Sequence, residues 1–133
     1  MSAKVTAVVV ADDVRREVSG KDILIGVFGG DVLVPVLPSP VQVALWIQMD
    51  VKGKDVAIEI EMTMPNGADE GVKMSFVMQG DLDQSASVTS PLIGTVVTSE
   101  GHIIVRFREN DGKDTFTEVA RKRIRVGGPR LAS

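Results

Sequence analysis

The chain has no cysteine and no tyrosine, and its 133 residues include one histidine and one tryptophan. Without cysteine there is no disulfide framework, no thiolate nucleophile and no cysteine metal site. Hydrolytic and transfer enzymes usually need a nucleophile with a base, a paired acid and base, or a metal, and few residues here supply these. His102 follows Ser99, Glu100 and Gly101 in an expected turn, where we interpret it as an exposed polar residue. We expect no enzymatic activity and no catalytic residues.

Several functional motifs are missing as well. The chain contains neither of the phosphate-binding glycine patterns GxGxxG and GxxxxGK[ST], and it lacks the nucleophile motif GxSxG. Its net charge of −3 argues against general nucleic-acid binding. The apolar run in MSAKVTAVVVADD is too short for a membrane span or for the core of a signal peptide. These absences predict a soluble protein without a cofactor, a membrane segment or a nucleic-acid partner.

Two alternating apolar runs, residues 41–49 and 56–64, dominate the middle of the chain. Alternation with a period of two is typical of strands that have one face on a core and the other in water. We predict that the two runs form an antiparallel hairpin with its turn at Lys52 and Gly53. The predicted pairs are Met49–Val56, Ile47–Ile58, Leu45–Ile60, Val43–Met62 and Val41–Met64.

Other segments also have the pattern of strands, and these are residues 5–10, 22–28, 72–78, 102–110 and 114–126. Residues 11–20 are interpreted as a hairpin-like connection, with one helical turn as the alternative. Three prolines place residues 32–40 in an edge strand or a crossing loop. Residues 80–91 are small and polar and predict an exposed loop that allows a short strand near Val88.

These elements predict an all-β protein with a single-domain antiparallel β-sandwich of about seven or eight strands, of Ig-like or C2-like type. The domain spans residues 1–133, and residues 127–133 are expected to form a flexible tail. Five methionines fall on apolar faces of the predicted strands and are interpreted as core residues. They are Met49, Met62, Met64, Met74 and Met78.

Acidic residues gather in the predicted loops and give one candidate metal site. Calcium needs about six to eight oxygen ligands, and C2-type sandwiches supply them from loops at one end. Asp81 and Asp83, with Asp111 from another loop, are the residues that could form such a site. Ordinary solvated turn residues are the simpler interpretation, and calcium binding is kept as the alternative.

Basic residues gather near the C-terminus. Pairing across a turn at Asp111 and Gly112 sets Phe107 opposite Phe116 and creates a cationic outer face, with Glu118 pointing inward opposite Val105 unless a bulge intervenes. This face is interpreted as edge protection, with docking of an acidic protein or a phosphate backbone as the alternative. Its residues are Arg106, Arg108, Arg121, Arg123 and Arg125.

Trp46 is the one large apolar residue on the polar face of the predicted hairpin, beside Ala44 and opposite Glu59. An isolated strand pair would leave it exposed to water. Either another segment of the chain or a partner protein is therefore expected to cover Trp46, which makes it a candidate partner-binding residue.

The stretch AVVVADDVRREVSGKDILIGVFGGDV, followed by a proline-bounded segment, resembles a family of small uncharacterised bacterial and phage proteins. Its members open with a strand, a DDVRxE-like segment, GK and a second strand ending in GVF or GVY. The similarity is clearest over residues 7–31 and weaker beyond them. The resemblance implies a β-sandwich in a bacterial or phage setting and carries over no catalytic or binding residue. Asp12, Asp13, Arg15, Glu17 and Lys21 are interpreted as a charged turn with internal salt bridges.

The combined expectation is a non-enzymatic protein–protein interaction module or structural accessory module. It would meet a partner or a second copy through an edge strand, the Trp46 face, the cationic face or the 80–91 loop. The alternative is a C2-like module that binds calcium or a small ligand. We expect a cytoplasmic protein, or a virion-associated one if a phage encodes it.

Overall fold

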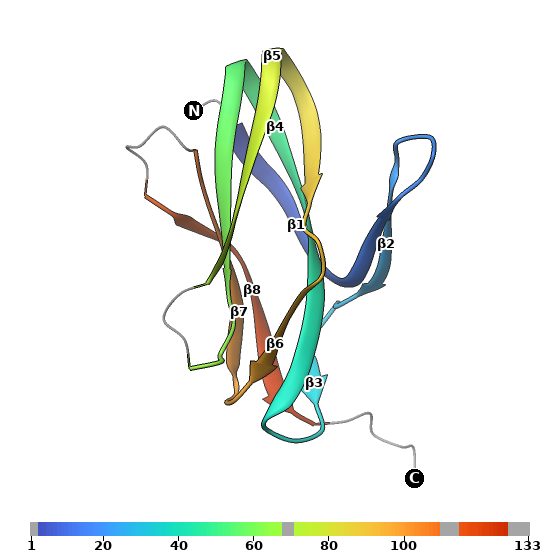
Figure 1. The fold of residues 1–133 in the computed structure, drawn as a ribbon, viewed down its shortest axis with the longest axis vertical. Coiled ribbons are helices and arrows are strands. Elements are labelled where there is room, and N and C mark those ends of the chain that lie inside the picture. Colours follow the sequence, from blue (N-terminus) through green and yellow to red (C-terminus); the bar gives the residue numbers. More distant parts are fainter. Residues whose placement is uncertain (1–2, 68–70, 110–114, 128–133) are drawn as a thin grey trace.

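The computed structural model describes residues 3–67, 71–109 and 115–127, which form eight β-strands and no helix (Figure 1). The predicted all-β class is confirmed. None of the described residues forms a helix that is long and apolar enough to cross a membrane. The strands are β1 (Ala3–Arg16), β2 (Asp22–Val27), β3 (Val32–Val34), β4 (Ser39–Thr63), β5 (Val72–Thr89), β6 (Ile93–Val97), β7 (Gly101–Glu109) and β8 (Thr117–Val126).

The predicted hairpin over residues 41–64 is wrong, because this segment is the single strand β4 of 25 residues. The strand bends sharply at residues 52–55, where Gly53 and Asp55 have φ values of 129° and 51°. Residues 39–51 form its first limb and residues 56–63 its second limb. The limbs run down two sides of the molecule (Figure 1). They do not pair with each other; β5 pairs with both, so that the two strands bend over together.

The alternation within each limb is confirmed even though the pairing is not. Alternate side chains of both limbs are buried in one core, together with residues of β3, β6, β7 and β8. Three of the five methionines assigned to the core, Met49, Met62 and Met64, are buried, and Met74 and Met78 are partly buried and pack against the core from β5. The most completely buried large side chains are Leu45, Ile47, Met49, Ile58, Ile60, Met62, Ile103 and Ile124.

The eight strands form one curled, mixed sheet. Its main path runs β2-β1-β4-β7-β8-β3, while β5 and β6 each pair with β4. The first limb of β4 lies beside β1 and the second limb lies beside β7, so the bend in β4 carries the sheet from one side of the core to the other. Strands β3 and β8 are parallel, which makes the sheet mixed rather than purely antiparallel.

Residues 80–91 were predicted as a loop, but most of them belong to β5, whose residues 81–89 pair with residues 46–54 of β4. Small polar residues give no apolar alternation, so the sequence pattern missed this half of the strand. Ser90 ends the pairing: its backbone N–H and its hydroxyl contact the backbone of Leu45, at 2.9 Å and 2.8 Å.

The predicted connection at residues 11–20 is a hairpin, as expected in preference to a helical turn. Strand β1 bends away from β4 after Ala11 and continues to Arg16, where a turn leads into β2. We call residues 12–27 the β1–β2 arm; it projects beside the body of the molecule (Figure 1). Gly26 is required at its base, because its φ is 67° and a Cβ there would overlap the carboxylate of Asp12.

The predicted pairing of Phe107 with Phe116 is wrong by one residue. A bulge between Val105 and Arg106 sets Phe107 opposite Thr117 and Arg106 opposite Glu118, while Val105 faces Ala120. Glu118 therefore avoids the core side that a regular register would have given it. The turn at Asp111 and Gly112 and most of the tail at 127–133, including Arg130, lie outside the described residues.

Candidate interaction surfaces

Trp46 is covered in part by another segment of its own chain. Its indole Nε1 donates a hydrogen bond of 3.0 Å to Oδ2 of Asp22 at the start of β2. The Ser87 hydroxyl donates to the same oxygen at 2.9 Å, and Arg16 Nε donates to the other carboxylate oxygen at 3.1 Å. One carboxylate thus joins the β1–β2 arm to β4 and β5. We call these four residues the Asp22 clasp.

The clasp replaces the predicted setting of Trp46 opposite Glu59. Trp46 instead has Val9 of β1 on one side and Thr89 of β5 on the other, and its side chain is half-buried. Of the two expectations for this residue, the geometry therefore favours cover by the chain itself. Asp22 and Ser87 were not singled out from the sequence, because the contacts of Asp22 with Trp46 and Ser87 join segments far apart in the chain and leave no local pattern.

Electrostatics keep the clasp carboxylate charged. Burial raises the pKa of Asp22 and is the largest single effect, but the hydrogen bonds from Ser87, Trp46 and Arg16 together outweigh it, so the pKa lies below its ordinary value. The Asp22 side chain is 10% exposed, and an ionised carboxylate in this position needs its three donors. The clasp is therefore a structural group that is fully formed at neutral pH.

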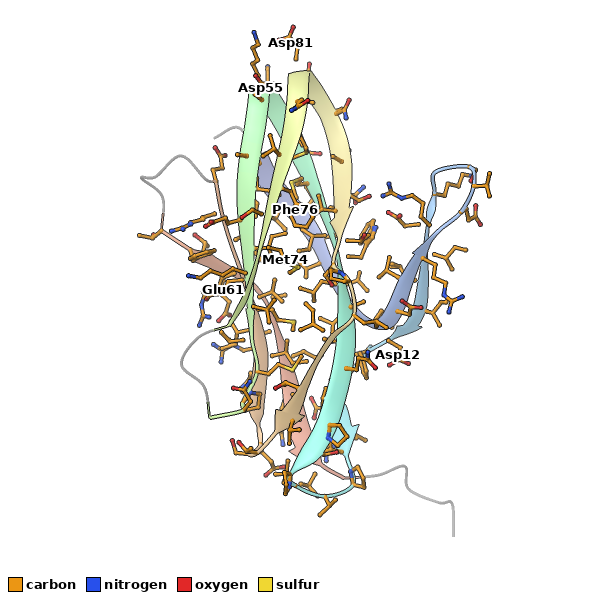
Figure 2. The ribbon with its side chains drawn as sticks, viewed as in Figure 1. Asp12, Asp55, Glu61, Met74, Phe76 and Asp81 are labelled. Atoms are coloured by element: carbon orange, nitrogen blue, oxygen red, sulfur yellow. The ribbon has the colours of Figure 1, made fainter. Side chains whose placement is uncertain are left out.

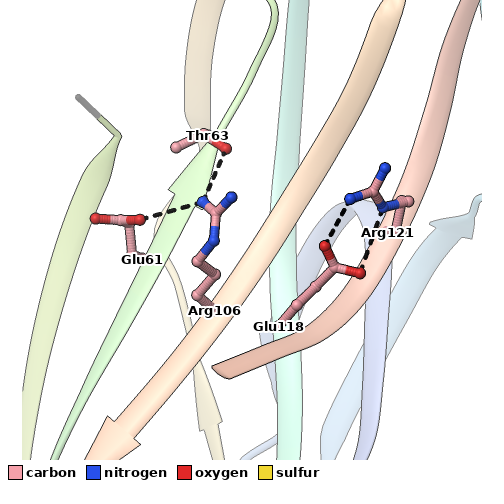
Figure 3. Close-up of polar contacts among 5 residues, drawn as sticks. All are labelled: Glu61, Thr63, Arg106, Glu118 and Arg121. Atoms are coloured by element: carbon pink, nitrogen blue, oxygen red, sulfur yellow. Dashed lines mark hydrogen bonds and ion pairs between the residues drawn. The ribbon is translucent and has the colours of Figure 1, made fainter. Parts of the chain in front are cut away.

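The predicted cationic face is a set of ion pairs. Arg106 lies 3.3 Å from Glu61, Arg108 Nε donates to Glu59 at 2.7 Å, and both carboxylates come from the second limb of β4. Arg121 lies 2.7 Å from Glu118 on its own strand (Figure 3). Arg125 and Arg123 both reach Asp31, at 2.7 Å and 3.9 Å.

These ion pairs reduce the positive charge that the surface presents to a partner. The five arginines lie within ion-pair distance of four carboxylates, with Asp31 shared by two of them, so the face presents mostly paired rather than open guanidinium groups. The hydrogen bond from Arg125 is the largest of the effects that hold the pKa of Asp31 below its ordinary value, and the hydrogen bond from Arg121 does the same for the pKa of Glu118. An acidic partner or a phosphate backbone would have to compete with these internal carboxylates.

The candidate calcium residues do not converge among the described residues. Asp81 and Asp83 are exposed on β5, where they lie opposite Lys54 and Lys52 on β4. Figure 2 shows Asp81 at the tip formed by the bend of the β4–β5 ribbon. Asp111 lies outside the described residues. No group of three histidine, aspartate or glutamate side chains in the described part of the chain could hold a metal ion. The lysines opposite the two aspartates work against cation binding at this tip.

Charged residues of the predicted turn at 12–21 form internal contacts. Arg15 pairs with Asp13 at 2.9 Å, and the Ser19 hydroxyl donates to Glu17 at 3.0 Å. His102, the single histidine of the sequence, lies in β7 opposite Arg123. Neither place gathers the set of groups that proton transfer or nucleophilic attack needs.

Four of the described strands have an open edge. Strand β2 pairs with β1 alone, β3 pairs with β8 alone, and β5 and β6 each pair with β4 alone. On β2, Ile23 and Ile25 are each 42% exposed and Val27 is 54% exposed. The exposed Ile23 and Ile25 alternate with the less exposed Asp22 and Leu24. Val27 follows Gly26, whose φ is 67°, and also lines a pocket with Val10 and Phe28. An exposed apolar edge strand offers unpaired backbone groups and side-chain contacts to another chain.

A partly open pocket with a mainly apolar lining lies between β1 and β8. It has a volume of about 270 Å³, and Val8, Val10, Phe28, Ile103 and Ala120 contribute to its lining. Ligand pockets are usually about 300–1,000 Å³ and contain a few polar groups that converge on the ligand. Arg121 also lines this pocket, but Glu118 already binds its guanidinium group. Neither the size of the pocket nor Arg121 therefore gives support for a small-ligand site.

No protein-family model matches the chain, and no curated protein is significantly similar to it. The surfaces described above are therefore the basis for assigning a function.

Proposed function

We propose that the chain is a non-enzymatic protein–protein interaction module that binds an extended segment of a partner protein along the open edge of β2. The observation that carries this proposal is the exposure of Ile23, Ile25 and Val27 on a strand with one unpaired edge. Backbone hydrogen bonds from such an edge supply affinity, and alternate side chains supply specificity. The partner segment would be β-branched and apolar, to cover the isoleucines.

The Asp22 clasp supports the same assignment. It holds the start of β2 against β4 and β5 through hydrogen bonds of 3.0 Å from Trp46 and 2.9 Å from Ser87. A strand that is fixed before binding loses less conformational entropy when a partner adds to it. The clasp would thus present the edge of β2 in a binding-ready position.

The ADDVRREVSGK segment also belongs to this site. Its charged residues pair within the β1–β2 arm, Arg15 with Asp13 and Arg16 with Asp22, and they leave the apolar face of β2 as the surface for contact. The resemblance of residues 7–31 to small bacterial and phage proteins supports a bacterial or phage setting. A cytoplasmic or virion-associated location goes with that setting.

The proposal includes an assignment of the curled sheet to a β-sandwich architecture. Both limbs of β4 bury alternate residues in one shared core, as the facing layers of an Ig-like or C2-like β-sandwich do. We assign the curled sheet to that architecture, with the bent β4–β5 ribbon crossing from one layer to the other. Such a scaffold leaves edge strands as its natural binding surfaces.

Site-specific photo-crosslinking in the cells that naturally produce the protein tests the β2 site. A photoreactive residue placed at Ile25 is expected to form an adduct with a partner protein, and the same residue at Val36 is the matched control. Val36 is an apolar residue that is 61% exposed and lies outside β2. The substitution Ile23→Lys should remove the Ile25 adduct without changing the circular dichroism spectrum. Equal adducts at both positions, or none at Ile25, would reject the β2 site.

A further inference from the structure

Lys122 leaves β8 on the side of the strand that faces the core. It pairs with the fully buried Ile103 of β7, and the side chains of directly opposed residues lie on the same face of a sheet. Ile124, two positions along β8, is also fully buried, whereas the neighbours Arg121 and Arg123 are exposed. Lysine is rarely placed on the core side of a strand without a partner. Lys122 is therefore a cation at the border of an apolar core.

This cation has no internal counter-ion in the described part of the chain. No carboxylate there lies within ion-pair distance of Lys122. Asp31 is held by Arg125 at 2.7 Å and by Arg123 at 3.9 Å. The hydrogen bond from Arg125 is the largest cause of the lowered pKa of Asp31, and Lys122 adds only a smaller electrostatic effect. Lys122 thus differs from the arginines around it, which are paired.

Lys122 lines the pocket between β1 and β8, together with apolar residues such as Val8 and Phe28. The pocket lies where two strand segments are each unpaired on one side. Residues 3–10 of β1 pair with β4 alone, and residues 117–123 of β8 pair with β7 alone. A dry cavity of about 150 Å³ binds benzene, so this pocket of about 270 Å³ takes roughly ten non-hydrogen atoms.

We propose that this pocket binds a small amphipathic anion, a carboxylate on an apolar chain or ring, with the ammonium group of Lys122 as its counter-ion. The apolar part would lie against the valines and Phe28, and the carboxylate would stay at the mouth of the pocket. The flexible stem of a lysine covers apolar surface while its charge remains near water, which suits this position. Binding needs neither Ile23 nor Ile25, so the proposal stands or falls separately from the β2 partner site.

Octanoate and 1-octanol provide the first test, because they share an apolar chain and differ in charge. Calorimetry should show saturable binding of one octanoate per chain, with an affinity at least about tenfold above that of 1-octanol. Amide chemical shifts should change mainly at the residues that line the pocket. Equal affinities, no saturable binding, or shift changes confined to the exposed strand edges would overturn the proposal.

Substitution of Lys122 tests the counter-ion. Lys122→Met keeps an unbranched side chain and removes the charge, so it should weaken octanoate binding about tenfold and leave 1-octanol binding unchanged. Lys122→Arg should keep the preference for octanoate. Lys54→Met is the matched control, because Lys54 is exposed at the bend of β4, outside the pocket. An unchanged affinity of Lys122→Met for octanoate would show that the lysine only covers apolar surface, and would overturn the proposal.

A variant that fills the pocket tests the location. Ala120 lies opposite the fully buried Val105 and lines the pocket, and Ala120→Leu adds an isopropyl group there. It should weaken the binding of both probes by at least about tenfold. Val8→Phe fills the same pocket from β1 and replaces this variant if circular dichroism shows that Ala120→Leu does not fold. Undiminished octanoate binding by a folded filling variant would place the ligand elsewhere and overturn the site.

Discussion

Trp46 Nε1 donates a hydrogen bond of 3.0 Å to Oδ2 of Asp22, which lies 24 positions away in the sequence. The contact covers part of Trp46 with another segment of its own chain, which is one of the two expectations for this residue, and a role in partner binding stays a prediction. It also links the position of the β1–β2 arm to the ionisation of a single carboxylate. The mobility of the arm should therefore depend on each of the three donors to Asp22.

Removal of one donor should loosen the arm selectively. Ser87→Ala deletes the hydroxyl that donates to Asp22 at 2.9 Å, and hydrogen bonds to charged groups contribute about 1.5–3 kcal/mol. We expect faster amide hydrogen exchange in β2 and a small loss of global stability. Ser85→Ala is the control, because Ser85 donates to Asp50 at 3.0 Å from an exposed position on the same strand. Equal exchange in β2 for the two variants would show that the clasp does not hold the arm.

The free energy of unfolding should fall in acid, in part because Asp22 becomes protonated. The pKa of Asp22 is lowered in the folded protein, so its contribution is fully present above the unfolded-state pKa, about 3.9, and is lost as pH falls through the lower folded-state pKa. Asp31 and Glu118 have lowered pKa values and act in the same direction. Urea unfolding from pH 7 to pH 2 measures the loss.

The variant Asp22→Asn isolates the clasp in that titration. It should lose less stability between pH 5 and pH 2 than the wild type does, and its Trp46 fluorescence should not titrate in that range. A wild-type curve and a variant curve of the same shape would assign the acid sensitivity to other carboxylates.

The sequence pattern identified which residues of β4 face the core but paired them wrongly. Any two alternating strands match when laid side by side, so the agreement between residues 41–49 and 56–64 could not show that they are neighbours. On β5, residues 81–89 pair with residues 46–54 and residues 72–78 pair with residues 56–62, and the segment 81–89 is mostly small and polar and has no strong apolar alternation. The sequence therefore could not identify residues 81–89 as a strand partner of β4, because they lack apolar alternation.

Contacts between distant polar residues were harder to predict than strands. The bulge at Val105 and Arg106 changed the partner of Glu118, and the pairing of Arg106 with Glu61 depends on β4 lying beside β7. Such contacts depend on which strands are neighbours in the sheet, and a single sequence gives little information about strand order. The charge pattern predicted that the arginines would share a face, while their neutralisation by Glu59, Glu61 and Asp31 needed the structure.

The ion pairs on that face should differ in strength. Arg108 pairs with Glu59, and its guanidinium lies 4.3 Å from the centre of the Phe116 ring. A double-mutant cycle with Arg108→Ala and Glu59→Ala should give a coupling energy of up to about 1 kcal/mol. The more exposed pair of Arg121 and Glu118 should give a smaller coupling that disappears at 1 M salt. A larger coupling for the exposed pair would contradict this ranking.

The shared core predicts a large effect from either limb of β4. Ile60 is 1% exposed, and Ile60→Ala should lower the free energy of unfolding by about 2–5 kcal/mol, because it removes buried surface and leaves a cavity. Leu45→Ala on the other limb should cost a similar amount. Val36→Ala, at an exposed site, should stay within about 0.5 kcal/mol of the wild type. Chemical denaturation measures all three, and a small effect at only one limb would argue against one shared core.

The bend of the β4–β5 ribbon should depend on Asp55. This residue has a φ of 51°, and its Oδ1 accepts a hydrogen bond of 2.8 Å from the backbone N–H of Gly80, which has a φ of 93° (Figure 2). The left-handed conformation costs about 1–2 kcal/mol for an ordinary residue, least for asparagine, aspartate and glycine. Asparagine keeps both the conformation and the acceptor, glycine keeps only the conformation, and alanine keeps neither. Urea denaturation should therefore rank Asp55→Asn above Asp55→Gly, and Asp55→Gly above Asp55→Ala. If alanine matched glycine, backbone conformation at residue 55 would not limit the bend, and the hydrogen bond to Gly80 would remain as its determinant.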